Sequence, residues 1–301
     1  MEQPFFSICI PTYKQPELLR ILLRSIDNQT FRNFEVIISD DSNDNSVELV
    51  ASEVWTFNLD YYKNTESLGS PENWNKSIEK ATGKWIKIMH HDDFFANEDS
   101  LKIMYDSISE NNKYDFFFCS TIIYNAKTKE KHFYAPNEEY INSLNALPTN
   151  LFQANVIGGP SATIFRRELS VKFDKSLIWL VDIEFYTQVI LKNKIFRIQE
   201  KLIVTSAELE TQLTTSLQDN GNIEIFEYFY CYEKLLPIIN EQNKKIFRIV
   251  LMNLIDKYEI KSAKEITDVY RNSKINSLVR YYAETKSKFI KKLILKFNNI
   301  F

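Results

Sequence analysis

Residues 5–42 read FFSICIPTYKQPELLRILLRSIDNQTFRNFEVIISDDS, and this stretch decides the fold. Its first six residues are mostly apolar and predict a buried strand that ends at Pro11. Pro16 then opens a helix whose apolar residues recur at helical spacing, namely Leu19, Leu22, Leu23 and Ile26. Residues 34–39 predict a second buried strand. Strand, helix and strand in this order indicate two parallel strands joined by a crossover helix.

The same alternation continues along the chain. Further strands are predicted at 59–62, 85–89 and 114–124, and helices at 46–54, 70–83 and 99–110, with Ser70 as the N-cap of the second of these helices. We therefore expect an α/β fold with a mainly parallel sheet and helices on both faces. From about Asn222 the pattern becomes helical, and Asp219–Asn222 is the best break.

Composition narrows the class of protein. The chain has 301 residues, 44% hydrophobic and 26% charged, which is typical of a globular protein. Its net charge of −3 argues against a general nucleic-acid binder. The three cysteines are far apart and predict buried free thiols in a reducing compartment. The first residues lack the basic and apolar regions of a signal peptide, and no apolar stretch approaches 18 residues, so we expect a cytoplasmic protein.

Glycine is scarce where several nucleotide-binding families require it. The chain has five glycines, and none precedes Gly69. The first strand–helix turn therefore cannot be a glycine-rich phosphate cradle of the dinucleotide-binding or P-loop type. This excludes typical dehydrogenases and P-loop kinases. A nucleotidyltransferase, which needs a glycine-rich first loop, is also a poor candidate.

Polar segments follow three of the predicted strands directly: Pro11–Thr12–Tyr13, Asp40–Asp41–Ser42 and His90–His91–Asp92–Asp93. Ligands of parallel sheets bind outside the carboxyl ends of the strands, so we expect these segments to line one site. Asp92 and Asp93 suit a hard divalent cation, Mg²⁺ or Mn²⁺, that shares its oxygen ligands with substrate phosphates. Such an ion neutralises a diphosphate leaving group.

Other interpretations of these segments stay open at this point. The acids at 92 and 93 could turn the chain or cap the next element, and Asp40–Asp41–Ser42 could be a turn that starts a helix. A zinc site at His90, His91 and Asp92 is disfavoured, because adjacent residues of an extended chain point to opposite sides.

Three segments together resemble the family-2 glycosyltransferases of the GT-A fold: SICIPTY at 7–13, EVIISDDS at 35–42, and ATGKWI at 81–86 ahead of the acid pair. The resemblance is dense over residues 5–95, weaker over 155–215 and absent beyond about 220. It implies inverting transfer of a sugar from a nucleoside-diphosphate sugar to a glycan or lipid-linked acceptor in bacterial surface-polysaccharide synthesis. UDP is the nucleotide that the family resemblance favours, and Mn²⁺ or Mg²⁺ is the implied cofactor.

The resemblance also implies a domain organisation. Residues 1–220 would form the GT-A catalytic domain, with the nucleotide-sugar-binding half at 1–125 and the acceptor half at 126–220. Residues 221–301 would form a helical C-terminal region.

By position, the resemblance assigns roles to these segments. Pro11, Thr12 and Tyr13 would border the nucleotide, and Asp41, with Asp40 beside it and Ser42 after it, would meet the base. Asp92 matches the last acid of the family's D-x-D motif, the metal and diphosphate ligand, and the acid Asp93 would support the ion or only the loop.

The sequence departs from this motif at its first position, where His90, followed by His91, replaces an acid. A neutral imidazole can hydrogen-bond a ribose hydroxyl, but it cannot offer the metal a negatively charged ligand. The departure leaves open a catalytically impaired sugar-nucleotide-binding protein.

Inverting transfer needs a general base on the acceptor side. Residues 180–186 read LVDIEFY and resemble the family's acidic motif at a helix start. By that match Asp182 is the base and Glu184 the second choice, while helix capping by Asp182 is the structural alternative. The pair Gly158–Gly159 could let the backbone approach a sugar or could be a turn. The polar run Glu208–Ser216 is predicted to close over the diphosphate.

The last segment, Lys286–Phe301, reads KSKFIKKLILKFNNIF and carries five lysines and no acid. Its apolar residues recur at helical spacing. Such a helix can lie on an anionic membrane surface, which would place the protein on the inner face of the cell membrane. A terminal helix packed on its own domain, with its lysines in water, is the other interpretation.

Overall fold

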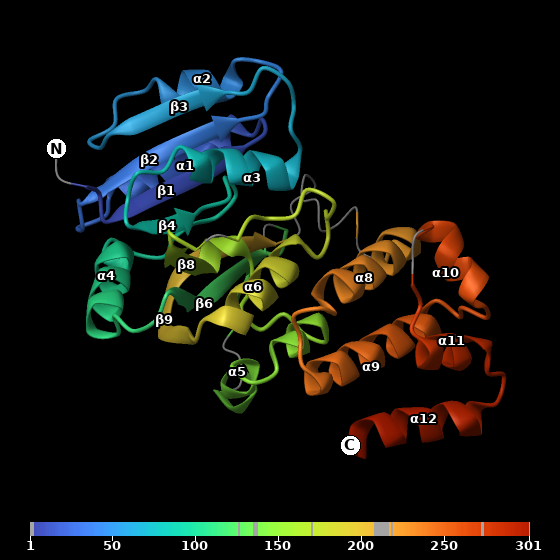
Figure 1. Cartoon of the computed structure of the whole chain (residues 1–301). Coiled ribbons are helices and arrows are strands. Elements are labelled where there is room, and N and C mark those ends of the chain that lie inside the picture. Colours follow the sequence, from blue (N-terminus) through green and yellow to red (C-terminus); the bar gives the residue numbers. More distant parts are fainter. Residues whose placement is uncertain are drawn as a thin grey trace.

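The computed structural model describes residues 3–125, 127–134, 138–169, 171–207, 217, 219–271 and 274–300. Within these residues nine strands form one sheet in the order β3-β2-β1-β4-β8-β6-β9-β5, with β7 paired to β6 (Figure 1). The strands are β1 (Phe6–Thr12), β2 (Phe34–Asp40), β3 (Leu59–Lys63), β4 (Trp85–Ile88), β5 (Phe94–Phe95), β6 (Phe116–Asn125), β7 (Lys131–Tyr134), β8 (Thr163–Arg166) and β9 (Ile195–Ala207).

The sheet is mixed. Strands β3, β2, β1 and β4 run parallel, as residues 5–42 predict. Strand β8 is antiparallel to both of its neighbours, β4 and β6, whereas β6 and β9 are again parallel. The predicted α/β fold is confirmed, with its parallel pairs continuous from β3 to β4 and found again between β6 and β9.

Helices flank the sheet on both faces. Over the sheet lie α1 (Pro16–Asp27), α2 (Ser46–Ala51), α3 (Ser70–Glu79), α4 (Ser100–Glu110), α5 (Glu138–Leu144) and α6 (Val181–Lys192), with 3₁₀ turns η1 (Pro148–Phe152) and η2 (Pro160–Ala162). One buried cluster joins α1, α2 and α4 to one face, and a second joins α6 to the other face. All three cysteines are buried and free, as predicted.

The described residues from 219 onward contain the helices α8 (Gly221–Leu235), α9 (Glu241–Lys257), α10 (Ala263–Val269), α11 (Ser277–Glu284) and α12 (Lys288–Ile300). Figure 1 shows them grouped at one end of the molecule, with α8 beside α6. Residues of α8 and α9 share the second buried cluster with α6 and the sheet. Asn220 caps α8 by accepting the N–H of Ile223 at 3.3 Å. Among the described residues no helix is both long and apolar enough to cross a membrane.

The expected end of the first strand differs from the structure. Strand β1 does not end at Pro11 but continues to Thr12, which pairs with Asp40 of β2. The carbonyl of Cys9 faces β4 and accepts the N–H of Met89. The nitrogen of Pro11 points to the same side as the Cys9 carbonyl, at a level where β4 has already ended. The lack of an N–H at Pro11 therefore costs no hydrogen bond to β4.

A polar anchor at the opposite end of the sheet fixes the turn that leads into β4. The Glu35 carboxylate accepts bonds from Ser7 Oγ at 2.6 Å, Thr82 N at 2.7 Å and Gly83 N at 3.0 Å, which ties β1, β2 and the start of β4 together. A Cβ at position 83 would lie 2.8 Å from the nitrogen of Ser7, so only glycine fits this close approach.

Candidate functional site

The three polar segments predicted to line one site do meet at one edge of the sheet. Thr12 and Asp40 are direct partners in the β1–β2 register, and Asp41 N donates to the Thr12 carbonyl at 3.0 Å. His90 and the residues after it leave β4, the other neighbour of β1. The carboxyl ends of the parallel strands therefore place these segments side by side.

Asp40 and Asp41 have different partners. Asp40 is fully buried and accepts bonds from Ser42 N at 2.9 Å and Tyr61 OH at 2.8 Å. Asp41 organises the segment that leads into α3: its carboxylate accepts from Asn64 Nδ2 at 3.1 Å, Ser67 Oγ at 2.9 Å, Leu68 N at 2.8 Å and Gly69 N at 2.9 Å. Contact of either acid with a nucleotide base stays a prediction.

The expected N-cap of α3 is wrong by one residue. Gly69, not Ser70, occupies the N-cap position, with a positive φ of 79°. Because Asp41 holds the N–H of Gly69, the turn into the helix is fixed from another strand and needs no capping side chain of its own.

The loop between β1 and α1 takes a conformation normally left to glycine. Lys14 and Gln15 both have left-handed backbones, with φ of 57° and 59°. Lys14 N donates to Ser42 Oγ at 2.6 Å, which fixes the loop against the end of β2. Tyr13 stays 51% exposed at this edge. Backbone strain of this kind clusters at ligand sites.

His90, Asp92 and Asp93 form a group whose ligand atoms all lie within 4.8 Å of one another. The His90 ring packs against Trp74 with ring centroids 4.7 Å apart, and its buried Nε2 has no hydrogen-bond partner among the residues that the structure describes. Burial lowers the pKa of His90 to about 4, so the imidazole is neutral at pH 7. The group could hold a metal ion, and its two acids offer the oxygen ligands that hard divalent cations prefer. His91 lies outside this group.

Neighbouring strands hold the acid pair. Ser206 of β9 donates its hydroxyl to the Asp92 carbonyl at 2.7 Å and its N–H to Asp93 Oδ1 at 3.3 Å. Burial raises the pKa of Asp93 to about 8, and the nearby charge of Asp92 contributes to the rise. Lys87 is fully buried in β4 and donates to the carbonyl of Ser161, and its burial lowers its pKa to about 8. The predicted closing segment Glu208–Ser216, just after β9, lies outside the described residues.

Asp182 lies in the first turn of α6. Its carboxylate accepts from Asn155 Nδ2 at 2.9 Å and from Ile183 N at 2.8 Å. The N-cap position is Leu180, so Asp182 does not cap the helix. Burial raises the pKa of Asp182 to about 6. A half-buried carboxylate that is ionised at neutral pH is suited to accept a proton.

Residues 155–161 connect Asp182 to the His90 group. The carbonyl of Gly158, which has a left-handed φ of 91°, accepts from Asn155 Nδ2 at 3.2 Å and from Tyr186 OH at 3.2 Å. Three residues on, Ser161 Oγ accepts the N–H of His90 at 2.9 Å. The glycine pair thus lies between the two candidate centres, and its approach to a sugar stays a prediction.

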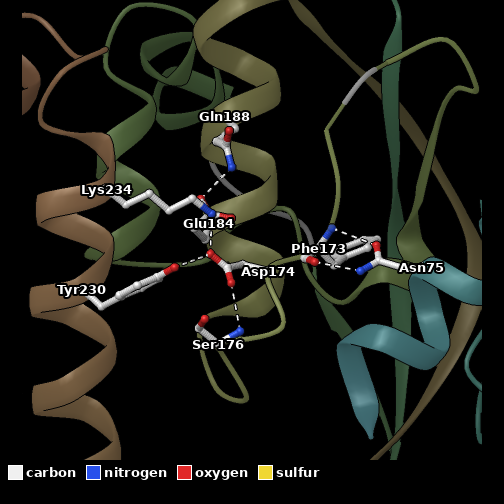
Figure 2. Close-up of polar contacts among 8 residues, drawn as sticks. All are labelled: Asn75, Phe173, Asp174, Ser176, Glu184, Gln188, Tyr230 and Lys234. Carbon is white, nitrogen blue, oxygen red and sulfur yellow. Dashed lines mark hydrogen bonds and ion pairs between the residues drawn. The ribbon is translucent and has the colours of Figure 1, made fainter. Parts of the chain in front are cut away.

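Glu184, the second candidate base, is engaged elsewhere (Figure 2). It is fully buried, pairs with Lys234 of α8 at 2.8 Å, and accepts from Gln188 Nε2 at 2.6 Å. Lys234 also pairs with Asp174 at 2.5 Å, and Tyr230 OH donates to Asp174 at 2.7 Å. The structure therefore joins Glu184 to α8, while Asp182 is joined to the segment that reaches His90.

The Glu184 network gives a stability prediction. Lys234→Met is expected to lower the free energy of unfolding by about 3 kcal/mol, because it leaves a buried carboxylate without its cation. Urea unfolding followed by circular dichroism measures the change. The matched control is Lys244→Met, which breaks a surface pair with Glu241 and should cost less than about 1 kcal/mol. Equal losses in the two variants would refute the structural role.

Several residues of the site were not predicted from sequence. They are Trp74, Lys87, Asn155, Ser161 and Ser206. Lys87 gave a signal, since a charged residue interrupts an otherwise apolar strand. The others are ordinary residues of helices, strands and loops, and no local pattern distinguishes them.

Comparison with known proteins gives consistent results. Residues 7–172 match the model of glycosyl transferase family 2. The chain is 36% identical over 120 residues to the abequosyltransferase RfbV of Salmonella typhimurium, covering 38% of this chain and 34% of that protein.

Two solved structures resemble nearly the whole chain. TarS of S. aureus in complex with UDP-GlcNAc has a TM-score of 0.64 at 16% identity, covering 98% of this chain and 91% of that one. The mannosyltransferase PcManGT of Pyrobaculum calidifontis in complex with GDP-Man and Mn²⁺ has a TM-score of 0.57 at 13% identity, covering 100% and 87%. The GT-A fold expected from the sequence is confirmed.

Proposed function

Because the chain belongs to glycosyl transferase family 2, we propose that it moves a sugar from a nucleoside-diphosphate sugar to an acceptor hydroxyl with inversion at the anomeric carbon. The observation that carries this proposal is the link through residues 155–161 between the His90 group and Asp182. The complexes of TarS with UDP-GlcNAc and of PcManGT with GDP-Man and Mn²⁺ support a nucleotide-sugar donor.

The donor would lie along the carboxyl ends of β1, β2 and β4. We propose that Pro11, Thr12 and Tyr13 border the nucleotide and that Asp40–Ser42 meet its base, with UDP the first nucleotide to test. His90, Asp92 and Asp93 would hold Mn²⁺ or Mg²⁺, which stabilises the negative charge of the departing diphosphate. The buried, unpaired Nε2 of His90 supports this assignment.

Asp182 would act as the general base. Asn155 donates to its carboxylate and so fixes the direction of the remaining oxygen lone pairs. As the acceptor oxygen bonds to the anomeric carbon and the bond to the diphosphate breaks, Asp182 takes the acceptor proton. Its pKa of about 6 keeps it ionised at neutral pH and leaves it basic enough to accept that proton.

A panel of donors tests the function. Release of nucleoside diphosphate is measured for UDP-glucose, UDP-galactose, UDP-GlcNAc and GDP-mannose, with MnCl₂ and with EDTA, where water serves as the acceptor. We expect one donor to be hydrolysed and EDTA to stop its hydrolysis. Binding of a donor without release under any condition would instead favour the catalytically impaired binding protein, and pyrophosphate release from a nucleoside triphosphate would favour a nucleotidyltransferase.

The last helix bears on the acceptor. One side of α12 packs on the protein through Ile294 and Leu295, and Lys291 pairs with Asp256 of α9 at 2.8 Å. The other side exposes Phe289 (71%) and, beside it, Ile290 and Leu293. Both interpretations of the tail thus have support, each from one side of the helix. We propose that the exposed side meets an anionic membrane where a lipid-linked acceptor for a surface polysaccharide lies.

Vesicle binding tests the membrane proposal. The double variant Phe289→Ser/Leu293→Ser is expected to bind phosphatidylglycerol vesicles at least about tenfold more weakly, because each exposed apolar side chain contributes about 1 kcal/mol or more on insertion. Cosedimentation measures the change. The control, Leu49→Ser/Val54→Ser, removes exposed apolar side chains near α2 and should bind as the original protein does. Absence of binding by the original protein, or an equal loss in the control, would refute the proposal.

A further inference from the structure

Helix α8 supplies a buried carboxylate to the segment that precedes α6. Glu227 is 1% exposed, and its oxygens accept three backbone N–H groups: Ile178 at 2.6 Å, Trp179 at 3.0 Å and Leu180 at 2.7 Å. An anion at the N-terminus of a helix is stabilised by the helix dipole and by these otherwise unpaired donors. Glu227 thus holds the N-cap residue of α6 and the two residues before it.

Among the described residues, the N–H groups of residues 178–180 have their side-chain partner on α8 and not on α6. Leu180, at the N-cap position, has no polar side chain, and the carboxylate of Asp182 accepts from Asn155 instead of from the N–H groups before it. The segment that leads to the turn is also held from elsewhere (Figure 2): Asn75 of α3 exchanges two bonds with the backbone of Phe173, at 2.8 and 3.0 Å, and Lys234 pairs with Asp174. The position of Asp182 therefore depends on α3 and α8 as well as on α6.

We propose that Glu227 is a positioning residue for the transfer reaction: it fixes the backbone of residues 178–180 and thereby aims Asp182, two residues on, at the acceptor. The proposal rests on the proposed function, since it takes Asp182 as the base. It makes the C-terminal helical region part of the catalytic machinery, beyond any role in membrane contact.

The charge of Glu227 should affect the pKa of Asp182, and packing alone would not produce this effect. The groups that face Asp182 are Asn155 from the neighbouring segment, Tyr186 from its own helix and Glu227 from α8. Burial is the main cause of the raised pKa of Asp182, and the negative charge of Glu227 adds to it. Burial also raises the pKa of Glu227 itself, and its three N–H donors oppose that rise.

The test compares Glu227→Gln with Glu227→Asp in the full chain, using the donor identified in the panel and water as acceptor. Glutamine keeps the length but loses the charge, and its amide group turns an N–H toward backbone N–H donors. Aspartate keeps the charge but shortens the reach. The control is Glu233→Gln, also on α8, whose carboxylate accepts from Tyr270 OH and Lys274 N, away from α6.

We expect Glu227→Gln to lower kcat about tenfold or more with little change in the donor KM, and to move the acid limb of the kcat profile to lower pH. Removal of a negative charge near Asp182 makes its ionised form easier to reach, so that shift is downward. Glu227→Asp should lower kcat but keep the limb in place. Glu233→Gln should leave both unchanged. Thermal unfolding, measured on each variant, separates these effects from loss of the fold.

Three outcomes would overturn the proposal. Glu227→Gln with the original kcat and limb would remove the positioning role. An equal loss of kcat in Glu233→Gln would show a general effect of α8. The third outcome is a loss of kcat in Glu227→Gln that is explained by its lower unfolding temperature, with Glu227→Asp fully active and the acid limb of the kcat profile unmoved. It would show that Glu227 only stabilises the fold. If Asp182→Asn were as active as the original protein, the proposed base itself would fail, which is a separate result.

Discussion

Replacing Asp182 with asparagine is expected to lower kcat for nucleoside-diphosphate release about a thousandfold at pH 7.5, which is the size of effect that loss of a general base produces. Asparagine has nearly the shape of aspartate and keeps one of the two hydrogen bonds, because Asn155 Nδ2 and Ile183 N donate to different oxygens of Asp182. It cannot take a proton. The fold and donor binding should therefore survive, and kcat should fall with the donor KM nearly unchanged.

The pH profile checks the reason for that loss. Because burial raises the pKa of Asp182 to about 6, the carboxylate is protonated below that pH and ionised above it. The kcat of the original protein should therefore rise from pH 5 to pH 7 and level off, and the residual kcat of Asp182→Asn should lack this rise. A rise retained in the variant would assign the titration to another group.

Glu184→Gln is the matched control, a carboxylate two residues along the same helix. Its partners are Lys234 and Gln188, so we expect a loss of stability and a change in kcat below about tenfold. If Glu184→Gln lost a thousandfold and Asp182→Asn stayed active, the two assignments would have to be exchanged.

The parallel half of the fold could be predicted because its signals are local. Apolar runs, a proline at the first helical position and short polar segments after each strand all lie within a few residues of the elements they define. The common edge for Thr12, Asp40 and His90 follows from parallel topology alone, since every carboxyl end points the same way. The antiparallel insertion of β8 between β4 and β6 has no such local signal.

The partners of the acids could not be predicted in the same way. Asp41, Glu184 and Glu227 are similar as sequence, yet one binds a neighbouring loop, one pairs with a lysine and one holds the N-terminus of another helix. The partners named here lie 23 to 50 residues away in the chain. Burial then separates their chemistry further, because a carboxylate removed from water must find donors or a cation.

Asp92→Ala is expected to lower nucleoside-diphosphate release at least about a thousandfold, since Asp92 is the carboxylate that we propose holds the metal at the diphosphate. Of the two acids in the His90 group, Asp92 is the more exposed, and Asp93 is buried. Asp92 is thus the carboxylate that a donor can reach. Mn²⁺ affinity should fall in the same variant, and electron paramagnetic resonance of free Mn²⁺ measures it without any turnover.

The control is Asp106→Ala, which removes an exposed carboxylate of α4 that pairs with Lys102 and should change neither release nor Mn²⁺ affinity. His90→Ala separates the two functions of the group. If the His90 imidazole binds the metal, His90→Ala should lower the affinity for Mn²⁺. If the ring only packs on Trp74, the variant should instead lose stability. If Asp92→Ala kept both its Mn²⁺ affinity and its turnover, the metal would have to be held elsewhere, and the link between the His90 group and Asp182 would no longer describe a catalytic centre.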